Sequence, residues 1–395
     1  MKHKHLTILL AMLMSMVASQ LMAYDAEIDG IYYNFKLSDK TATVTYYDSS
    51  DNVSAYSGSV VIPDMVTYDG TTYAVTSIDK TAFTGCSGLT SVTIPKSVTS
   101  IGSSAFFGCK GLTSVTIPEN VTSIGTGAFT NCTGLTSLTY NARNCTTCGT
   151  SLYPAFPSNI TTLTIGNEVK AIPAYAFQGC SGLTSVTIPE SVTSIGSWAF
   201  SGCTNIKTLD LNCNEIGNWF GDSKKSITTV ELGDNVKSIG ERAFFGFSSL
   251  TSVNIPENVT SIGDYAFDGC SGLTSITIPK NVTSIGGWAF RDCTGLTEIY
   301  CLSEETPVVG DDTFDGMDVS NVLLIVPDDA VQKYQAHPIW GQFNINTTTG
   351  VRAIGTEENS TKTVYDLSGR QQTKMQRGLN IIKATDGHVR KVMVR

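Results

Sequence analysis

Eleven cysteines are the side chains of this sequence that could act as nucleophiles, metal ligands or disulfide partners. Seven of them share one spacing, three residues after a recurrent phenylalanine: Cys86, Cys109, Cys132, Cys180, Cys203, Cys270 and Cys293. The equivalent residue after Phe244 is Phe247. Because free cysteine behaves as a small apolar side chain, a position that accepts either residue is a packing position. We therefore predict buried free thiols at these positions.

The other four cysteines are Cys145, Cys148, Cys213 and Cys301. Cys145 and Cys148 form a single Cys-x-x-Cys pair in an irregular stretch. A structural zinc site needs about four ligands, and no second pair stands at a suitable spacing. In an oxidising compartment a disulfide is therefore favoured over a metal for this pair.

Histidine, the usual general base, is scarce, because only His337 and His388 remain beyond residue 23. A Ser-His-Asp or Cys-His mechanism needs a positioned base, and we expect His337 to be solvated or packed. The sequence contains no HExxH, P-loop or GxSxG motif. The acidic run at 311–318 could hold calcium but lacks the EF-hand spacing. We expect no catalytic residue, no metal and no cofactor, and hence no enzyme.

The elements that would position these groups form a repeat. Phenylalanines recur mostly every 23 residues, with intervals from 20 to 27, at Phe83, Phe106, Phe129, Phe156, Phe177, Phe200, Phe220, Phe244, Phe267, Phe290 and Phe314. That spacing makes about eleven units. A unit of this size cannot bury its own apolar face and must stack on its neighbours, so the period predicts a solenoid.

The unit at 111–135 shows how one coil is expected to fold. In "SVTIP" the alternation predicts a short strand with Val115 and Ile117 inward and Thr116 outward. Pro118 ends the strand because proline cannot donate to a ladder. We expect Phe129 to follow on a short helical or 3-10 turn and to fill the core.

The pattern "LTSVTIPxxVTSIGxxAFxGCxGL" over residues 76–327 resembles the BspA-like, Treponema pallidum-type leucine-rich repeat. The resemblance implies a curved, right-handed, β-rich solenoid with a strand on its concave side. Residues 28–50 resemble the N-terminal β cap of such proteins, and residues 325–343 resemble their closing repeat with an amphipathic helix. Solenoid ends need caps, because an open end exposes core and strand edge.

Five segments are expected along the chain. Residues 1–23 have the charged start and apolar run of a signal peptide, and no other run is apolar enough to suggest a membrane span. A β cap at 24–75, the solenoid with its capping helix at 76–345 and a linker at 346–363 follow. Residues 364–395 resemble the C-terminal sorting domain of Bacteroidetes type IX secretion, which implies a secreted, extracellular or outer-membrane location.

The charge pattern excludes one class of partner. The formal net charge is −9, although the segment 361–395 is basic, so the remainder is strongly acidic. Nucleic-acid binding needs a basic footprint, and we expect no nucleic-acid partner. The sequence leaves the oligomeric state open.

Two sets of residues are candidates for binding. The outward position of the expected strands is threonine in the first half and then varies, giving the concave candidates Asp210, Glu231, Asn254 and Tyr300. The position two before each phenylalanine carries two aromatic pairs, which either bind a ligand or pack on the next coil: Tyr175 with Trp198, and Tyr265 with Trp288. Loops displaced from a rigid scaffold also carry function, which favours the irregular units around 145–156, 210–220 and 300–314.

These features indicate a non-catalytic, secreted or surface-displayed binding protein. The resemblance implies adhesion to host extracellular matrix, to a glycoprotein or to other bacteria. The alternative is a surface protein that captures glycans through the aromatic pairs.

Overall fold

The structure is a computed structural model. It describes residues 24–47, 56–213, 215–217 and 219–347, and the backbone of four strands near the C-terminus. The expected signal peptide at 1–23 lies outside the described residues, as does nearly all of the expected linker at 346–363.

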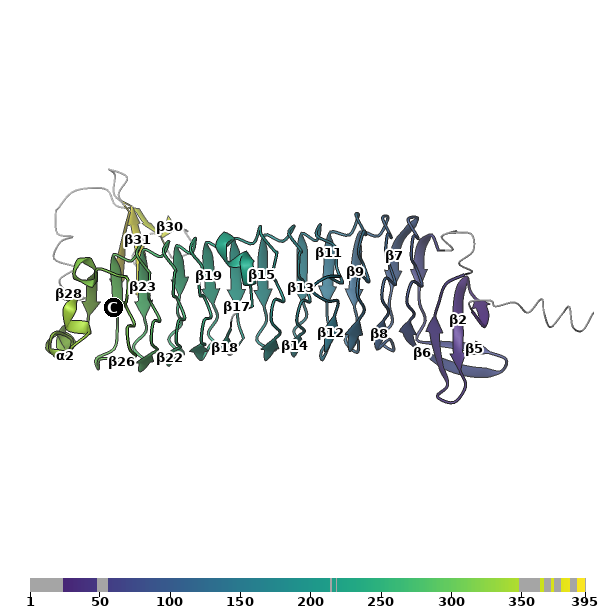
Figure 1. Ribbon diagram of the computed structural model, residues 1–395, viewed down its shortest axis with the longest axis horizontal. Coiled ribbons are helices and arrows are strands. Elements are labelled where there is room, and N and C mark those ends of the chain that lie inside the picture. Colours follow the sequence, from purple (N-terminus) through teal and green to yellow (C-terminus); the bar gives the residue numbers. More distant parts are fainter. Residues whose placement is uncertain are drawn as a thin grey trace, which may run out of the picture.

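The body is the β-solenoid that the sequence predicts, with a repeat of about 23 residues and about twelve turns, where about eleven units were expected. Figure 1 shows the coils side by side in one row with little curvature. Parallel strands from successive coils lie in two rows along the solenoid, the long ladder and the short ladder, and within each row they pair in several separate sheets.

The long ladder carries most of the strand residues. Its members are β4 (Gly58–Val61), β7 (Leu89–Thr93), β9 (Ser114–Ile117), β11 (Ser137–Tyr140), β13 (Thr162–Ile165), β15 (Ser185–Ile188), β17 (Thr208–Leu211), β19 (Thr229–Leu232), β21 (Ser252–Asn254), β23 (Ser275–Ile278), β25 (Glu298–Cys301), β27 (Leu323–Val326) and β28 (Asn344–Thr347). In β9 Val115 and Ile117 are buried and Thr116 is exposed, as the alternation predicts.

The short ladder lies on another side of each coil. Its members are β8 (Ser100–Ile101), β10 (Ser123–Ile124), β12 (Thr147–Cys148), β14 (Ala171–Ile172), β16 (Ser194–Ile195), β18 (Glu215–Ile216), β20 (Ser238–Ile239), β22 (Ser261–Ile262), β24 (Ser284–Ile285) and β26 (Val308–Val309). Glycine follows most of these strands because the coils approach closely there. A Cβ added at Gly125 would lie 2.4 Å from the backbone nitrogen of Ser103.

The segment that carries each core phenylalanine is a run of turns, in keeping with the short helical or 3-10 turn expected from the sequence, and it does not extend into a helix. Isolated i→i+3 bonds occur, such as Thr130 N–H to Gly127 O at 3.0 Å. The intervening Phe129 N–H instead donates to Ala155 O of the next coil at 2.7 Å. Because alternate amides pair between coils, a helix cannot propagate through this segment.

A column of phenylalanine rings forms the centre of the solenoid. Phe83 and Phe106 are stacked with ring centroids 4.7 Å apart, and Phe106 and Phe129 follow at 4.9 Å. Tyr56 closes the N-terminal end of the column at 4.4 Å from Phe83, and Trp340 closes the other end at 5.3 Å from Phe314.

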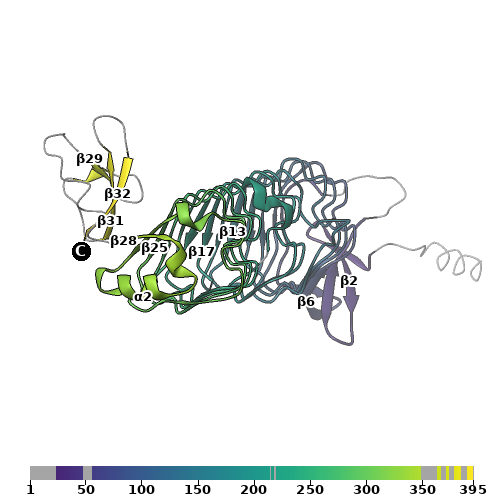
Figure 2. The ribbon, with the colours of Figure 1, turned by 60° about the vertical axis from the view of Figure 1, so that its left-hand side comes forward.

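The two ends differ from the coils. Before the first regular coil lie β1 (Ala26–Ile28), β2 (Ile31–Lys36), β3 (Thr41–Val44), β5 (Met65–Tyr68) and β6 (Thr71–Ile78), mostly in antiparallel pairs. Within the described residues the helical elements are η1 (Gly221–Ser226), η2 (Val319–Asn321), η3 (Asp328–Ala330), α2 (Val331–Ala336) and η4 (Trp340–Gln342). Figure 2 shows α2 at the C-terminal end of the row.

A small antiparallel sheet forms from the last part of the chain, in the order β30-β29-β31-β32. Its strands are β29 (Thr363–Tyr365), β30 (Gln371–Gln372), β31 (Gly378–Lys383) and β32 (Val389–Val394). The segment limits expected from the sequence stay predictions.

Candidate functional site

The seven cysteines at the recurrent position are buried free thiols, as predicted. Most of them donate a hydrogen bond to a carbonyl of the preceding coil, for example Cys132 Sγ to Phe106 O at 3.0 Å. Burial raises the pKa of the Cys203 and Cys293 thiols to about 12. The thiolate is the nucleophilic form, so these groups are inert at neutral pH.

Phe247 fills the cysteine position for a local reason. Its ring meets Phe220 edge-on at 6.1 Å and Phe244 edge-on at 5.4 Å, so it bridges the column beside the irregular coil that contains η1. Phenylalanine therefore replaces cysteine here because the neighbouring coil is irregular. The repeat position of Phe247 alone does not indicate this.

Cys145 and Cys148 are free thiols in the structure, so the disulfide that the sequence favoured over a metal is not formed. Cys145 Sγ donates to Thr147 O at 3.2 Å, and Cys148 Sγ donates to Ala176 O at 3.6 Å. The two thiols have different carbonyl partners because Cys148 lies in β12 and points into the core. Within the described residues no three His, Cys, Asp or Glu side chains gather as a metal site would require.

His337 has a structural place at the C-terminal end. Its Nδ1 accepts from the backbone N–H groups of Ile339 at 3.2 Å and Trp340 at 3.3 Å, just where η4 begins. The Trp340 indole in turn donates to Pro307 O at 3.2 Å. The imidazole stabilises the start of η4, and its Nδ1 already accepts these two hydrogen bonds. His388 lies outside the described residues.

Three of the four strand-face candidates lie together. Asp210 in β17 pairs in register with Glu231 in β19, which pairs with Asn254 in β21. We name Asp210, Glu231 and Asn254 the strand-face patch. Asn212 Nδ2 donates to Asp210 Oδ1 at 2.9 Å and holds that carboxylate in place, whereas Glu231 is exposed.

Tyr300 is separate from this patch. It lies in β25, beyond β23, where Thr277 is its neighbour in register. Its hydroxyl donates to Glu298 Oε2 at 3.1 Å, and burial raises its pKa. In the outward row expected from the sequence, Asp210, Glu231 and Asn254 lie on adjacent strands, and Tyr300 lies on β25 next to Thr277 of β23.

The four candidate aromatics share a strained backbone conformation. Their φ angles are positive, at 61° for Tyr175, 64° for Trp198, 56° for Tyr265 and 53° for Trp288. A left-handed conformation costs an L-residue about 1–2 kcal/mol. The sequence did contain a signal for it, because Gly127 and Asp312 occupy the same repeat position.

The two aromatic pairs differ in their packing. Tyr265 and Trp288 stack face to face at 5.2 Å and 7°, and the Arg242 guanidinium lies 4.7 Å from the Tyr265 ring centroid. Because their ring faces are covered in this way, they have the geometry of inter-coil packing. Among the described residues no ring contact joins Tyr175 to Trp198, and Trp198 is 51% exposed. Trp198 therefore offers an open indole surface.

Charged groups near the first irregular coil pair with one another. Glu119 accepts from Arg143 Nη2 at 3.0 Å and lies 3.3 Å from Lys96 Nζ. A cleft of about 280 Å³ beside them is lined also by Asn141 and Glu168. Exposed pairs of this kind contribute little stability, and here they neutralise the edge of the cleft.

The family model described as BspA type leucine rich repeat region matches residues 71–155, 155–221 and 214–333 in six copies. No curated protein matches the chain. Over the described residues, no helix has the length and apolar character needed to cross a membrane.

Several solved structures are similar to this chain. A leucine-rich repeat protein from Bacteroides ovatus is 24% identical, covering 82% of this chain and 100% of its own, with a TM-score of 0.34. A leucine rich cell surface protein from Faecalibacterium prausnitzii is 25% identical, covering 85% of this chain and 98% of its own, with a TM-score of 0.32. A leucine-rich repeat protein from T. pallidum is 26% identical, covering 63% of this chain and 90% of its own, with a TM-score of 0.33.

Proposed function

Because this chain belongs to the BspA-type leucine-rich repeat family, we propose that it is a non-catalytic binding protein, displayed on a bacterial cell surface or secreted. Members of this family are cell-surface or secreted bacterial proteins and have binding roles. Two features of the described residues support a binding role over catalysis. The thiols are buried, and His337 Nδ1 accepts from two backbone amides.

The proposed role is adhesion to a protein partner: host extracellular matrix, a glycoprotein or the surface of another bacterium. One observation carries this proposal. The strand-face patch places two carboxylates and one amide on three adjacent coils, in register, on an otherwise threonine-rich face. A rigid extended face of this kind suits a large partner, because it presents fixed groups over several coils without a deep pocket.

The same proposal includes export of the chain and its attachment to the cell surface. Export would use residues 1–23, and the basic segment 364–395 would serve as a surface-sorting signal. A β cap at 24–75 and a linker at 346–363 would complete the arrangement around the solenoid.

A binding screen tests the adhesion proposal. The full chain is applied to immobilised collagen, laminin and fibronectin and to whole bacterial cells, at low and high salt. The proposal expects saturable binding to at least one of these, weakened by salt because carboxylates contribute to it. Absence of saturable binding to every surface in the panel would contradict it.

A second candidate function is glycan capture, and the exposed Trp198 favours it. An open indole surface can stack on a sugar ring, and the strained backbone of Trp198 is not offset by a ring contact among the described residues. Trp198→Ala should then abolish retention on a glycan array, while Trp288→Ala, whose ring is covered by Tyr265, should leave it unchanged. Equal behaviour of the two variants would exclude Trp198 as the glycan contact.

A further inference from the structure

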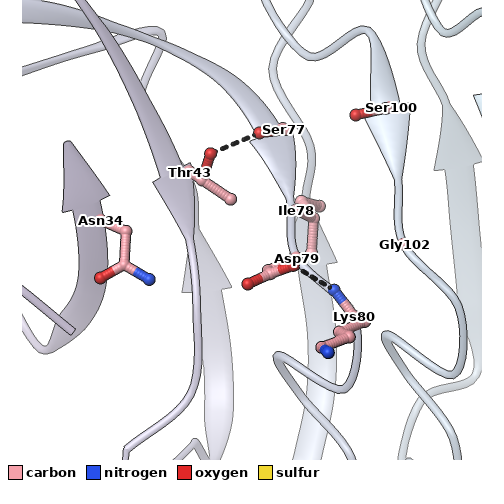
Figure 3. Close-up of a pocket in the computed structure, with 8 residues that line it drawn as sticks. All are labelled: Asn34, Thr43, Ser77, Ile78, Asp79, Lys80, Ser100 and Gly102. Carbon is pink, nitrogen blue, oxygen red and sulfur yellow. Dashed lines mark hydrogen bonds between the residues drawn. The ribbon is translucent and has the colours of Figure 1, made fainter. Parts of the chain in front are cut away.

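An open polar cleft of about 380 Å³ lies where the N-terminal hairpins meet the first coil. Its lining includes Asn34 from β2, Thr43 from β3, Ser77, Asp79 and Lys80 from β6 and the turn after it, and Ser100 from β8. Figure 3 shows these side chains around the opening, with Asn34 and Asp79 on opposite sides of it. The cleft is distant in sequence from the strand-face patch and from Trp198.

The cleft exists because the repeat is interrupted at this end. Asp79 occupies the position that is glycine in the next two coils, Gly102 and Gly125. At Gly102 a Cβ would lie 2.4 Å from the backbone nitrogen of Lys80, so a side chain cannot fit between regular coils. The Asp79 N–H pairs with Val44 O at 2.8 Å, and the chain then turns away, since Thr45 N–H pairs back to Tyr32 O. This arrangement leaves room for the Asp79 carboxylate in the cleft.

The groups around the opening are rich in hydrogen-bonding capacity. Asp79 Oδ1 accepts from the Lys80 N–H at 2.8 Å, and no protein donor among the described residues reaches its Oδ2. Thr43 and Ser77 share a hydrogen bond of 2.6 Å between their hydroxyls. The Ser100 hydroxyl and the Lys80 ammonium add a further acceptor and donors.

The balance of charge selects the kind of ligand. One carboxylate and one ammonium line the cleft, so it has no net charge and favours neither an anion nor a cation. Ile78, the one large apolar residue of the lining, is buried, which leaves little surface for an apolar ligand. A neutral molecule with several hydroxyl groups matches this set, because each hydroxyl can donate to a carboxylate and accept from an amide or ammonium.

We propose that this cleft binds a single neutral sugar unit, either free or at the end of a glycan chain. The site is independent of the proposed adhesive surface, because it shares no residue with the strand-face patch. Asp79 is the principal contact, and its carboxylate accepts hydrogen bonds from sugar hydroxyls. Ser100 forms the wall on the side of the first regular coil.

Two matched pairs of variants test this site. Asp79→Asn removes the charge and keeps an oxygen for the Lys80 N–H, and Asp69→Asn is its control in the exposed β5–β6 turn. Ser100→Phe fills the cleft, and Ser123→Phe is its control, one coil further along the same row. Thermal melts of all four variants check that the fold is retained.

Binding is measured by saturation-transfer NMR on the full chain, with methyl glycosides of glucose, galactose, mannose and N-acetylglucosamine and with the matching tetrasaccharides. At least one probe should bind with a Kd on the order of 1 mM, as few hydrogen bonds hold it. Asp79→Asn should weaken binding about tenfold or more, since hydrogen bonds to charged groups are strong. Ser100→Phe should abolish it, and both controls should bind like the unaltered chain.

The outcomes distinguish a free sugar from the end of a glycan chain, and they distinguish binding in the cleft from binding at Trp198. Equal affinity for glycoside and tetrasaccharide identifies a single sugar, and tighter binding of the tetrasaccharide identifies a chain end; both support the proposal. The proposal is overturned if no probe binds, or if Asp79→Asn and Ser100→Phe bind like their controls. It is also overturned if Trp198→Ala alone removes binding, which would place the sugar at Trp198.

Discussion

Replacing Phe247 by cysteine should open the solenoid locally at the coil beside η1. The Phe247 ring is 1% exposed and makes edge-on contacts with both Phe220 and Phe244. Deleting a buried aromatic ring costs about 3–5 kcal/mol, and the remaining sulfur recovers part of this. We expect a loss of about 3 kcal/mol in the free energy of local opening.

Hydrogen exchange is the suitable assay, because stacked repeats open locally and a single unfolding free energy is not well defined for them. The amides to follow are those of Phe247 and Leu250, which donate to Phe244 O at 3.2 Å and to Phe247 O at 3.0 Å. A loss of about 3 kcal/mol accelerates exchange by about a hundredfold at these amides. Exchange around Phe129 should be unchanged, because coils interact mainly with their neighbours.

Cys132 provides the matched comparison. Cys132→Ala removes one sulfur and one thiol–carbonyl hydrogen bond, so it should cost only about 1 kcal/mol locally. Cys132→Phe should overpack a regular coil and cost about 1–3 kcal/mol, although the sequence repeat contains phenylalanine at this position. The reasoning is refuted if Phe247→Cys leaves local exchange unchanged, or if Cys132→Phe protects its coil more than Cys132→Ala does.

Three further outcomes follow from the structure. The folded chain should not react with a thiol-specific reagent, whereas all eleven thiols should react after denaturation without reductant; fewer would indicate a disulfide. Stability should fall at alkaline pH, because burial raises the pKa of Cys203 and Cys293 to about 12, and the neutral thiols favour folding. This stabilisation is complete below the unfolded pKa near 9, and from about pH 8 to about pH 10 each thiol should lose about 1.4 kcal/mol, which urea unfolding would detect as a lower midpoint. Gly125→Ala should cost about 2 kcal/mol or more in the free energy of local opening, because its Cβ would lie 2.4 Å from the Ser103 nitrogen; unchanged hydrogen exchange in this coil would contradict this.

The regular part of the fold could be predicted because every coil repeats the same physical solution. The same strand alternation as at Val115 and Ile117 recurs in many coils, and so does the position of Cys132. Several repeats therefore support each of these predictions. In the regular coils each core phenylalanine stacks on its equivalent in the next coil. Period alone therefore identified the phenylalanine column.

The remaining features depend on contacts between coils that are not alike. Phe247 bridges two rings because the neighbouring coil contains η1, and the open space at Asp79 exists because no regular coil precedes it. Tyr300 occupies the same repeat position as Asp210, but Thr277 of β23 lies between its strand and the strand-face patch. These contacts occur where the repeat is irregular or ends. The spacing of residues within the repeat therefore cannot predict them.

The central claim is that the strand-face patch is the surface that binds a protein partner. The most direct test is the dissociation constant of the full chain for whichever immobilised surface it retains. The double variant Asp210→Asn, Glu231→Gln is compared with Glu257→Gln, an exposed acidic turn residue close to the patch. The account predicts binding weaker by about tenfold or more for the double variant, and unchanged binding for Glu257→Gln. Equal affinity of the unaltered chain and the double variant would contradict it.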